Sequence, residues 1–237
     1  MNIVCKFADI DIYLLYFLKI KTIFVLSTVS KEENELISKQ DFFREMQIMR
    51  KEIKVNKTNI IDEASRYGYI SILDWMDKSV NEFIHDEKAI NWASSNGHIL
   101  ILEWFDKSNY EIKYSEWAIN YASEKGYVII LDWFANSKYE FKYTEYAIDN
   151  AVKKGYIDVL KWFAKSKYEF KYSTYAIYYA LIDHKLEILK WFDESEYEIK
   201  YTVQNIMRVL KKDCTDIYNY LGPNSRIIKI LDQYAKN

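Results

Sequence analysis

The chain has 237 residues, half of them hydrophobic and 17% aromatic, so intrinsic disorder is excluded for most of it. Its formal net charge of −2 does not fit a protein built to coat nucleic acid, because such proteins are usually strongly basic. Only two cysteines are present, Cys5 and Cys214, which make no disulfide framework and indicate a reducing compartment. The single proline and five glycines are typical of closely spaced helices.

Residues 1–30 contain two short apolar runs, 10–18 and 23–26, separated by two lysines and preceded by Asp9. A membrane helix needs about 20 nearly uncharged apolar residues, and a signal peptide carries positive charge ahead of its apolar run. We expect a degenerate first repeat or a capping helix pair, with a membrane anchor and an unrelated extension as alternatives. Residues 31–55 indicate a polar linker and one helix with an apolar stripe. Residues 1–55 are therefore expected to cap the N-terminal end of a stack.

From residue 56 to residue 229 the sequence repeats every 29 residues. A tryptophan marks each step, at Trp75, Trp104, Trp133, Trp162 and Trp191. Six repeats begin at Asn56, His85, Tyr114, Tyr143, Tyr172 and Tyr201. The last is degenerate, since Tyr220 replaces the tryptophan, and residues 230–237 are assigned to a C-terminal capping tail. A fixed period of this size predicts a solenoid, here all-α with two helices and a short extended connector in each repeat.

The first helix of each repeat is predicted from its beginning and from its buried face. Position 2 can cap a helix N-terminus in five of the six repeats, with Asp86, Ser115, Thr144, Ser173 and Thr202. Positions 5, 6 and 9, which are Ala118, Ile119 and Ala122 in the third repeat, share one face and are expected to be buried. Positions 4, 7, 8 and 11 are then expected on the outer arc.

The first helix is expected to end at position 13, which is glycine in four repeats and can adopt the left-handed conformation. His184 and Asp213 occupy the same position in the fifth and sixth repeats, and both are expected to accept this conformation at some cost. The second helix has a strong apolar face. The tryptophan beside that face is expected to fill the groove between neighbouring repeats. Gly222 and Pro223 are expected to end the last second helix, before a final helix over 225–234.

Residues 93–105, Ala-Ser-Ser-Asn-Gly-His-Ile-Leu-Ile-Leu-Glu-Trp-Phe, resemble the ankyrin core A-x-x-x-G-H-x-x-I/V-L/V-x-x-L/F. The Trp-rich variant resembles the ankyrin arrays that large DNA viruses and some protists carry in many copies. The resemblance covers about residues 56–229. The ankyrin T-P-L-H tetrapeptide is absent, alternating connectors such as 137–143 replace the hairpin segment, and the repeat is about four residues shorter than the usual 33. The resemblance implies a protein-binding module, and its viral type implies a host protein as the partner.

The sequence contains no catalytic constellation. The three histidines, His85, His98 and His184, have no cysteine or second histidine at metal-ligand spacing. There is no P-loop, no dinucleotide-binding fingerprint and no nucleophile elbow. We expect no enzymatic activity, no cofactor and no metal, and a cytoplasmic monomer that binds neither nucleic acid nor a membrane.

Two function classes remain. The first is a scaffold that holds a protein partner on the concave side formed by the first helices, where aromatic residues are enriched at interfaces. The candidate residues occupy positions 4 and 8 and are Trp92, Trp117, Tyr121, Tyr146, Tyr175 and Tyr179. The position-4 residues Trp117, Tyr146 and Tyr175 are expected to form a continuous strip. The alternative is a repeat-type RNA-binding protein that stacks bases on the same aromatic rings.

Overall fold

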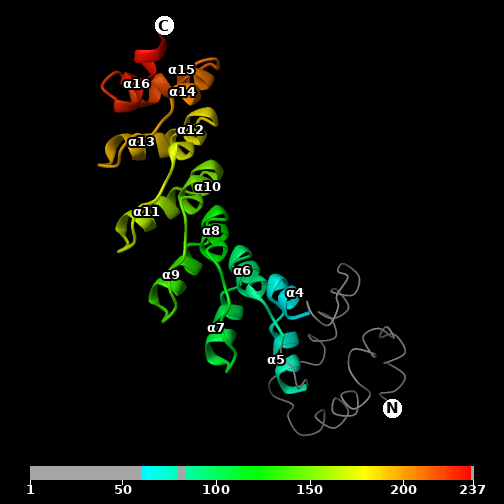
Figure 1. Cartoon of the computed structure of the whole chain (residues 1–237). Coiled ribbons are helices and arrows are strands. Elements are labelled where there is room, and N and C mark those ends of the chain that lie inside the picture. Colours follow the sequence, from blue (N-terminus) through cyan, green and yellow to red (C-terminus); the bar gives the residue numbers. More distant parts are fainter. Residues whose placement is uncertain (1–59, 80–83, 236–237) are drawn as a thin grey trace, which may run out of the picture. The chain divides into compact units, whose positions relative to one another are not determined.

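The computed structural model describes residues 60–79 and 84–235 (Figure 1). These residues form thirteen helices and no strand, so this part of the chain is all-α, as predicted. The N-terminal cap expected over 1–55 lies outside the described residues. The described residues divide into two compact units, one within residues 60–93 and 98–114 and the other within residues 94–97 and 115–235.

The described part of the first compact unit holds α4 (Ile60–Tyr67), α5 (Ile70–Ser79), most of α6 (Glu87–Ser95) and α7 (Ile99–Lys107). Helix α4 packs against α5, and α5 packs against α7. Two side chains of the later segment bind the earlier one. The Trp104 Nε1 donates to Asp74 Oδ1 at 2.5 Å, and the His98 ring binds the Arg66 carbonyl oxygen through Nε2 at 3.0 Å. The α6–α7 pair is therefore tied to the α4–α5 pair.

The second compact unit is built from helices in two rows (Figure 1). The first row holds α8 (Trp117–Glu124), α10 (Tyr146–Lys154), α12 (Thr174–Ile182) and α14 (Val203–Val209), each packed on the next. The second row holds α9 (Val128–Asn136), α11 (Ile157–Lys165) and α13 (Leu186–Glu194). Helices α15 (Thr215–Leu221) and α16 (Arg226–Ala235) follow and pack on α13. This successive packing is compatible with a helical repeat solenoid.

The predicted buried face of the first-row helices is confirmed. Ala118, Ile119 and Ala122 of α8 are completely buried, and so are the equivalent residues of α10, Ala147, Ile148 and Ala151. In the second row the largest buried side chains are Phe134, Phe163 and Phe192, together with the leucines Leu131, Leu160 and Leu189. Alanine at two of the three first-row positions allows the second row to approach closely, and the phenylalanines fill the remaining space.

The expectation that position 7 lies on the outer arc is wrong for the third and fourth repeats, whereas Met207, at position 7 of the sixth repeat, is exposed as expected. Asn120 and Asp149, which occupy this position, are only 1% and 4% exposed. Asn120 donates from Nδ2 to Thr144 Oγ1 at 3.0 Å and accepts from the Thr144 amide at 3.1 Å. Asp149 accepts from the Ser173 amide at 3.0 Å and from its hydroxyl. The side chain at position 7 therefore faces the next helix of the row, a neighbour that the rotation of a single helix does not take into account.

Position 2 is the N-cap of α12 and α14, at Ser173 and Thr202, as predicted, whereas α8 and α10 begin one residue later, after Glu116 and Glu145. Thr144 Oγ1 accepts from the amide of Tyr146 at 3.3 Å, and Ser173 Oγ accepts from that of Tyr175 at 3.1 Å. One side chain thus satisfies a free helix amide and also holds the preceding helix of the row.

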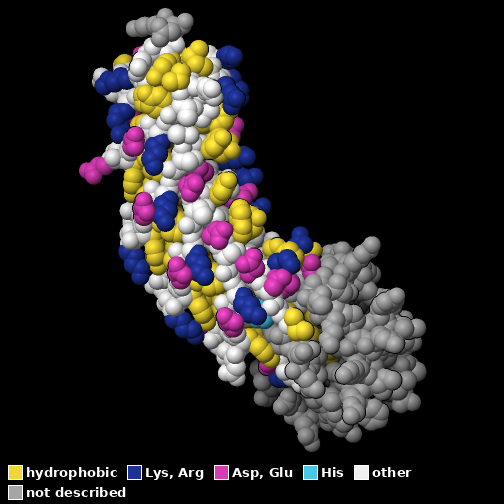
Figure 2. All heavy atoms as spheres, in the orientation of Figure 1, with side chains coloured by type: hydrophobic (Ala, Val, Ile, Leu, Met, Phe, Trp, Pro, Cys, Tyr) yellow, Lys and Arg dark blue, Asp and Glu magenta, His cyan; other side chains and the backbone are white. Residues whose placement is uncertain are grey.

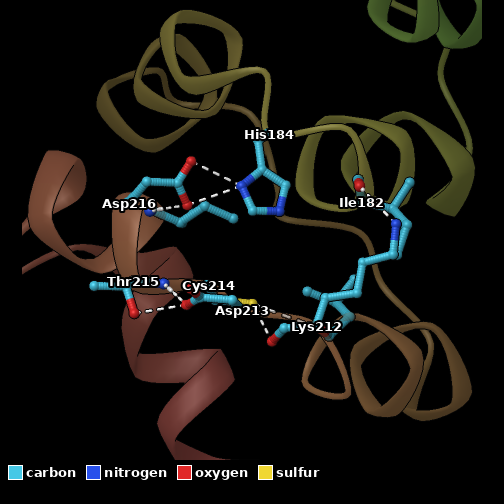
Figure 3. Close-up of polar contacts among 9 residues, drawn as sticks. Ile182, His184, Lys212, Asp213, Cys214, Thr215 and Asp216 are labelled. Atoms are coloured by element: carbon cyan, nitrogen blue, oxygen red, sulfur yellow. Dashed lines mark hydrogen bonds and ion pairs between the residues drawn. The ribbon is translucent and has the colours of Figure 1, made fainter.

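The left-handed turn is confirmed for the four repeat glycines, whose φ angles are 76°, 73°, 77° and 88° at Gly68, Gly97, Gly126 and Gly155. His184 also has a positive φ, of 50°, and is the only such non-glycine among the described residues. The expectation for Asp213 is wrong. Helix α14 already ends at Val209, and the Asp213 carboxylate instead accepts from the amide and hydroxyl of Thr215 at the beginning of α15, at 2.9 and 2.6 Å (Figure 3).

The tryptophans of α9, α11 and α13 do not belong to the fully buried core, whereas Trp75 of α5 is buried, at 4% exposed. Trp162 of α11 donates from Nε1 to Asp132 Oδ1 of α9 at 2.5 Å. Its ring is stacked 5.5 Å from Phe141 of the preceding connector. Trp133, Trp162 and Trp191 are nevertheless half-buried, whereas the phenylalanine after each is fully buried. A half-buried position suits the indole, because its N–H can then donate to a polar side chain at the protein surface.

The C-terminal end is closed by α16. Gly222, at a φ of 75°, ends α15 as predicted. The Arg226 guanidinium donates to the carbonyl oxygens of Asp193 at 3.0 Å, Tyr197 at 3.1 Å, Ser195 at 2.8 Å and Phe192. Arg226 thereby binds carbonyl oxygens of the last turn of α13 and of the connector that follows it. Helix α16 runs through the expected boundary between residues 229 and 230.

Candidate partner-binding surface

An exposed row of aromatic rings crosses the first-row helices of the second compact unit. Trp117, Tyr146 and Tyr175 are 37%, 53% and 53% exposed. Each is followed directly by a completely buried alanine, so the helix rotation directs the aromatic side chain away from the core. Each ring sits in the first turn of its helix, on α8, α10 and α12 in turn. The predicted outward position of these three residues is confirmed.

The rings support one another along and between helices. Trp117 stacks on Tyr121 within α8, with ring centroids 5.0 Å apart, and lies 6.0 Å from Tyr146 of α10. Tyr175 stacks on Tyr179 within α12 at 5.8 Å. Tyr121 and Tyr179 are half-buried and act as a floor for the exposed rings. We call these five residues, Trp117, Tyr121, Tyr146, Tyr175 and Tyr179, the aromatic strip.

The structure adds one ring that the sequence did not single out. Tyr178 of α12 is half-buried, with its ring 5.7 Å from that of Tyr179 and 6.5 Å from that of Tyr175. It occupies position 7, where other repeats hold the buried Asn120 or Asp149. An aromatic ring replacing a short polar side chain at that position was the signal that could have identified it.

The sixth predicted residue, Trp92, lies in α6 in the part that belongs to the first compact unit. Its ring is half-buried, and the guanidinium carbon of Arg66 lies 5.1 Å from the ring centroid. The Arg66 guanidinium therefore already forms a cation–π contact with the Trp92 ring. Trp92 is not part of the aromatic strip.

The strip is bordered by acidic residues on one side and by basic residues on the other. Trp117 contacts Tyr146 near the beginnings of α8 and α10, whereas Glu124 Oε1 lies 3.9 Å from Lys154 Nζ near their ends. The two helices therefore run parallel. Acidic residues precede the strip, at Glu116 and Glu145, and lysines follow it, at Lys125, Lys153 and Lys154. Both sets complement the helix dipoles.

The cluster shown in Figure 3 has structural contacts and not those of a catalytic site. His184 Nδ1 lies 2.7 Å from Asp216 Oδ2, which ties the turn after α12 to α15. Cys214 is buried and its Sγ donates to the Val209 carbonyl oxygen at 3.5 Å. Burial and the nearby carboxylates of Asp216 and Asp213 raise the pKa of the Cys214 thiol, so little of it is the nucleophilic thiolate.

The other described histidines also serve packing. His85 lies with its ring 5.0 Å from that of Phe105, and burial lowers its pKa. Burial also lowers the pKa of His98, whose ring packs on Gly68. Over residues 60–79 and 84–235, no group of histidine, cysteine and carboxylate side chains could hold a metal ion. No helix in the same part of the chain is both long and apolar enough to cross a membrane.

Comparison with protein-family models found no match to this chain, and comparison with curated proteins found none either. The geometry and charge of the aromatic strip therefore carry the functional argument.

Proposed function

We propose that this chain is a scaffold of ankyrin-like 29-residue repeats and that it holds a protein partner on the aromatic strip. The helix bounds support the repeat, since α9, α11 and α13 begin at Val128, Ile157 and Leu186, at the step of the tryptophans. Equivalent contacts also recur one repeat apart. The Asn120–Thr144 and Asp149–Ser173 pairs are both separated by 24 residues, and Tyr143–Glu169 and Tyr172–Glu198 are both separated by 26.

The observation that carries the binding proposal is the exposure of Trp117, Tyr146 and Tyr175 on three successive helices. Single exposed hydrophobic residues need no explanation, but a row of them indicates an interaction surface. Tryptophan and tyrosine contribute much of the binding energy at protein interfaces, because they bury a large area at a low cost in conformational entropy. The stacked Tyr121 and Tyr179 keep two of the exposed rings in place before a partner arrives.

The charges favour a protein over RNA as the partner. Glu116 and Glu145 directly precede Trp117 and Tyr146, so a phosphate backbone over those rings would meet carboxylates. Figure 2 shows acidic and basic side chains interspersed along the second compact unit. RNA binding is the second candidate, favoured only by the exposed rings, and it would show a steep dependence on salt.

The scaffold proposal assigns no catalytic residue, cofactor or metal. The viral-type resemblance of the repeats makes a host protein in the cytoplasm the proposed partner, bound by a monomer of this chain.

The proposal is tested with a triple variant, Trp117→Ser, Tyr146→Ser and Tyr175→Ser, in the full chain. Its affinity capture from cells should lose the partners of the unchanged chain, while circular dichroism shows that the helices persist. The matched control is Ile129→Ser with Tyr220→Ser, which are 56% and 45% exposed away from the strip and should retain every partner. A triple variant that keeps its fold and all partners excludes the strip as the binding surface.

A further inference from the structure

Two lysines beside the aromatic strip form no ion pair with any carboxylate of residues 60–79 and 84–235. Lys153, at the end of α10, places its Nζ 4.9 Å from the centroid of the Tyr179 ring on α12. Lys125 is exposed directly after α8. Among the described residues neither lysine forms an ion pair, whereas the neighbouring Lys154 lies 3.9 Å from Glu124. The edge of the strip therefore carries two cations with no anionic partner in this part of the chain.

The contrast with Lys154 shows how the charges are distributed. Glu124 accepts from Asn150 Nδ2 at 3.4 Å and also lies beside Lys154, so this carboxylate is engaged between α8 and α10. Glu116 and Glu145 are separated from the lysines by the length of their helices, since each precedes its helix. On α8 and α10 the strip thus has a basic edge at the helix ends and an acidic edge at the helix beginnings, whereas the exposed Asp183 follows α12.

A cation beside an aromatic ring binds a carboxylate that reaches the same surface, because the ring shields the ion pair from water and the pair gains strength. A uniformly anionic ligand such as a nucleic acid meets the Glu116 and Glu145 edge as well and is repelled there. The ligand that best fits the strip therefore has a row of apolar groups with carboxylates along only one side of that row. That arrangement is typical of an amphipathic polypeptide segment.

We propose that the aromatic strip takes an amphipathic segment of the partner whose apolar side chains cover Trp117, Tyr146 and Tyr175 and whose carboxylates bind Lys125 and Lys153. This inference rests on the proposed function, since it names the chemistry of the partner at the same surface. The segment lies across α8, α10 and α12, with its carboxylates at the C-terminal ends of α8 and α10.

The test begins with short random peptides displayed on phage and selected on the full chain. Selected peptides are synthesised with a fluorescent label, and their affinities are measured by anisotropy at low and high salt. We expect peptides that combine aromatic or aliphatic residues with Asp or Glu. Binding to the strip itself is checked with the triple serine variant, which should lose these peptides.

The charge is then tested with Lys125→Glu combined with Lys153→Glu. Affinity should fall by about tenfold or more at low salt and by less at high salt. The same peptides with Asp and Glu replaced by Lys should bind the double variant better than the unchanged chain. The matched control is Lys161→Glu with Lys165→Glu, two exposed lysines of α11 in the second row, which should leave affinity unchanged.

The outcomes separate the two proposals. Peptides that need the strip but carry no acidic residues, or that bind the Lys125→Glu and Lys153→Glu variant equally well, overturn this inference and leave the proposed function standing. If every selected peptide binds the triple serine variant as tightly as the unchanged chain, the proposed function is overturned and this inference with it. The same follows if no peptide is selected. A labelled single-stranded oligouridine that binds tightly, with a steep loss on adding salt, overturns both in favour of RNA.

Discussion

At the scale of single residues, two equivalent links between neighbouring first-row helices use different side chains. Asn120 exchanges two neutral hydrogen bonds with Thr144, whereas Asp149 places a buried carboxylate against Ser173. Burial raises the pKa of Asp149 above 3.8, although the hydrogen bonds from Ser173 oppose this shift. Ionising this side chain is therefore less favourable in the folded state than in the unfolded chain, a cost that a neutral asparagine avoids.

We predict that Asp149→Asn increases stability at neutral pH. Because the folded pKa is raised, the unfolded chain loses its proton first, so Asp149 lowers the free energy of unfolding as pH rises from about 3.8 to the folded value. Above that window the loss is complete and constant. Urea midpoints measured across this range should show the gain growing with pH and then levelling. Asn120→Asp is the reciprocal control and should introduce the same loss; flat profiles for both variants would contradict the assignment.

The repeat glycines allow a second matched comparison. Gly126 and Gly155 both have a positive φ, but a Cβ at Gly126 would lie 2.6 Å from the Tyr156 ring, whereas at Gly155 it would meet Lys185 at 3.7 Å. Gly155→Ala should cost about 1–2 kcal/mol from the left-handed backbone alone. Gly126→Ala should cost more, because Tyr156 must also move. Thermal unfolding measures both, and equal costs would show that the ring contact adds nothing.

At the scale of elements, each second-row helix places a half-buried tryptophan beside a fully buried phenylalanine. Phe134 is completely buried, and Trp133 meets it edge-on with ring centroids 4.9 Å apart. The other side of Trp133 stacks on Tyr139 at 5.7 Å. The phenylalanine thus fills the interior of the pair, and the tryptophan joins the helix to the connector.

We predict that Phe134→Ala costs about 3–5 kcal/mol, because it leaves a cavity in a closed interior. Trp133→Ala should cost less despite the larger ring, since half-buried neighbours can close over the space and water can enter. The two free energies are compared by chemical denaturation. A greater loss of stability for Trp133→Ala than for Phe134→Ala would contradict this account and would show that the tryptophan contributes more to the core.

The sequence predicted the features that depend on the geometry of a single helix. It did not predict the features that depend on contacts between two helices. The buried face of α8 followed from the rotation per residue, and the turn at Gly126 followed from its freedom to adopt a positive φ. The burial of Asn120 did not follow, because it depends on the hydroxyl of Thr144 in the next helix. The place of Asp213 also did not follow, because α14 is only seven residues long and ends before the expected turn.

At the scale of the whole molecule, the candidate surface extends beyond any one repeat. Trp117, Tyr146 and Tyr175 are one exposed side chain from each of three helices, and each alone would need no functional explanation. Periodicity predicted their direction, but the contact of Trp117 with Tyr146 and the place of Lys153 over Tyr179 required the packed helices. A binding surface of this kind is made by the stacking of repeats.

The central claim is that a protein partner lies on the aromatic strip, and site-specific photocrosslinking tests it most directly. A photoreactive phenylalanine analogue at Tyr146 is compared in cells with the same analogue at Tyr220, which is similarly exposed, at 45% against 53%. We predict discrete crosslinked proteins from position 146 that disappear when Trp117 and Tyr175 are changed to serine, and none of these proteins from position 220. The same proteins crosslinked from position 220 and not from position 146 would contradict the claim.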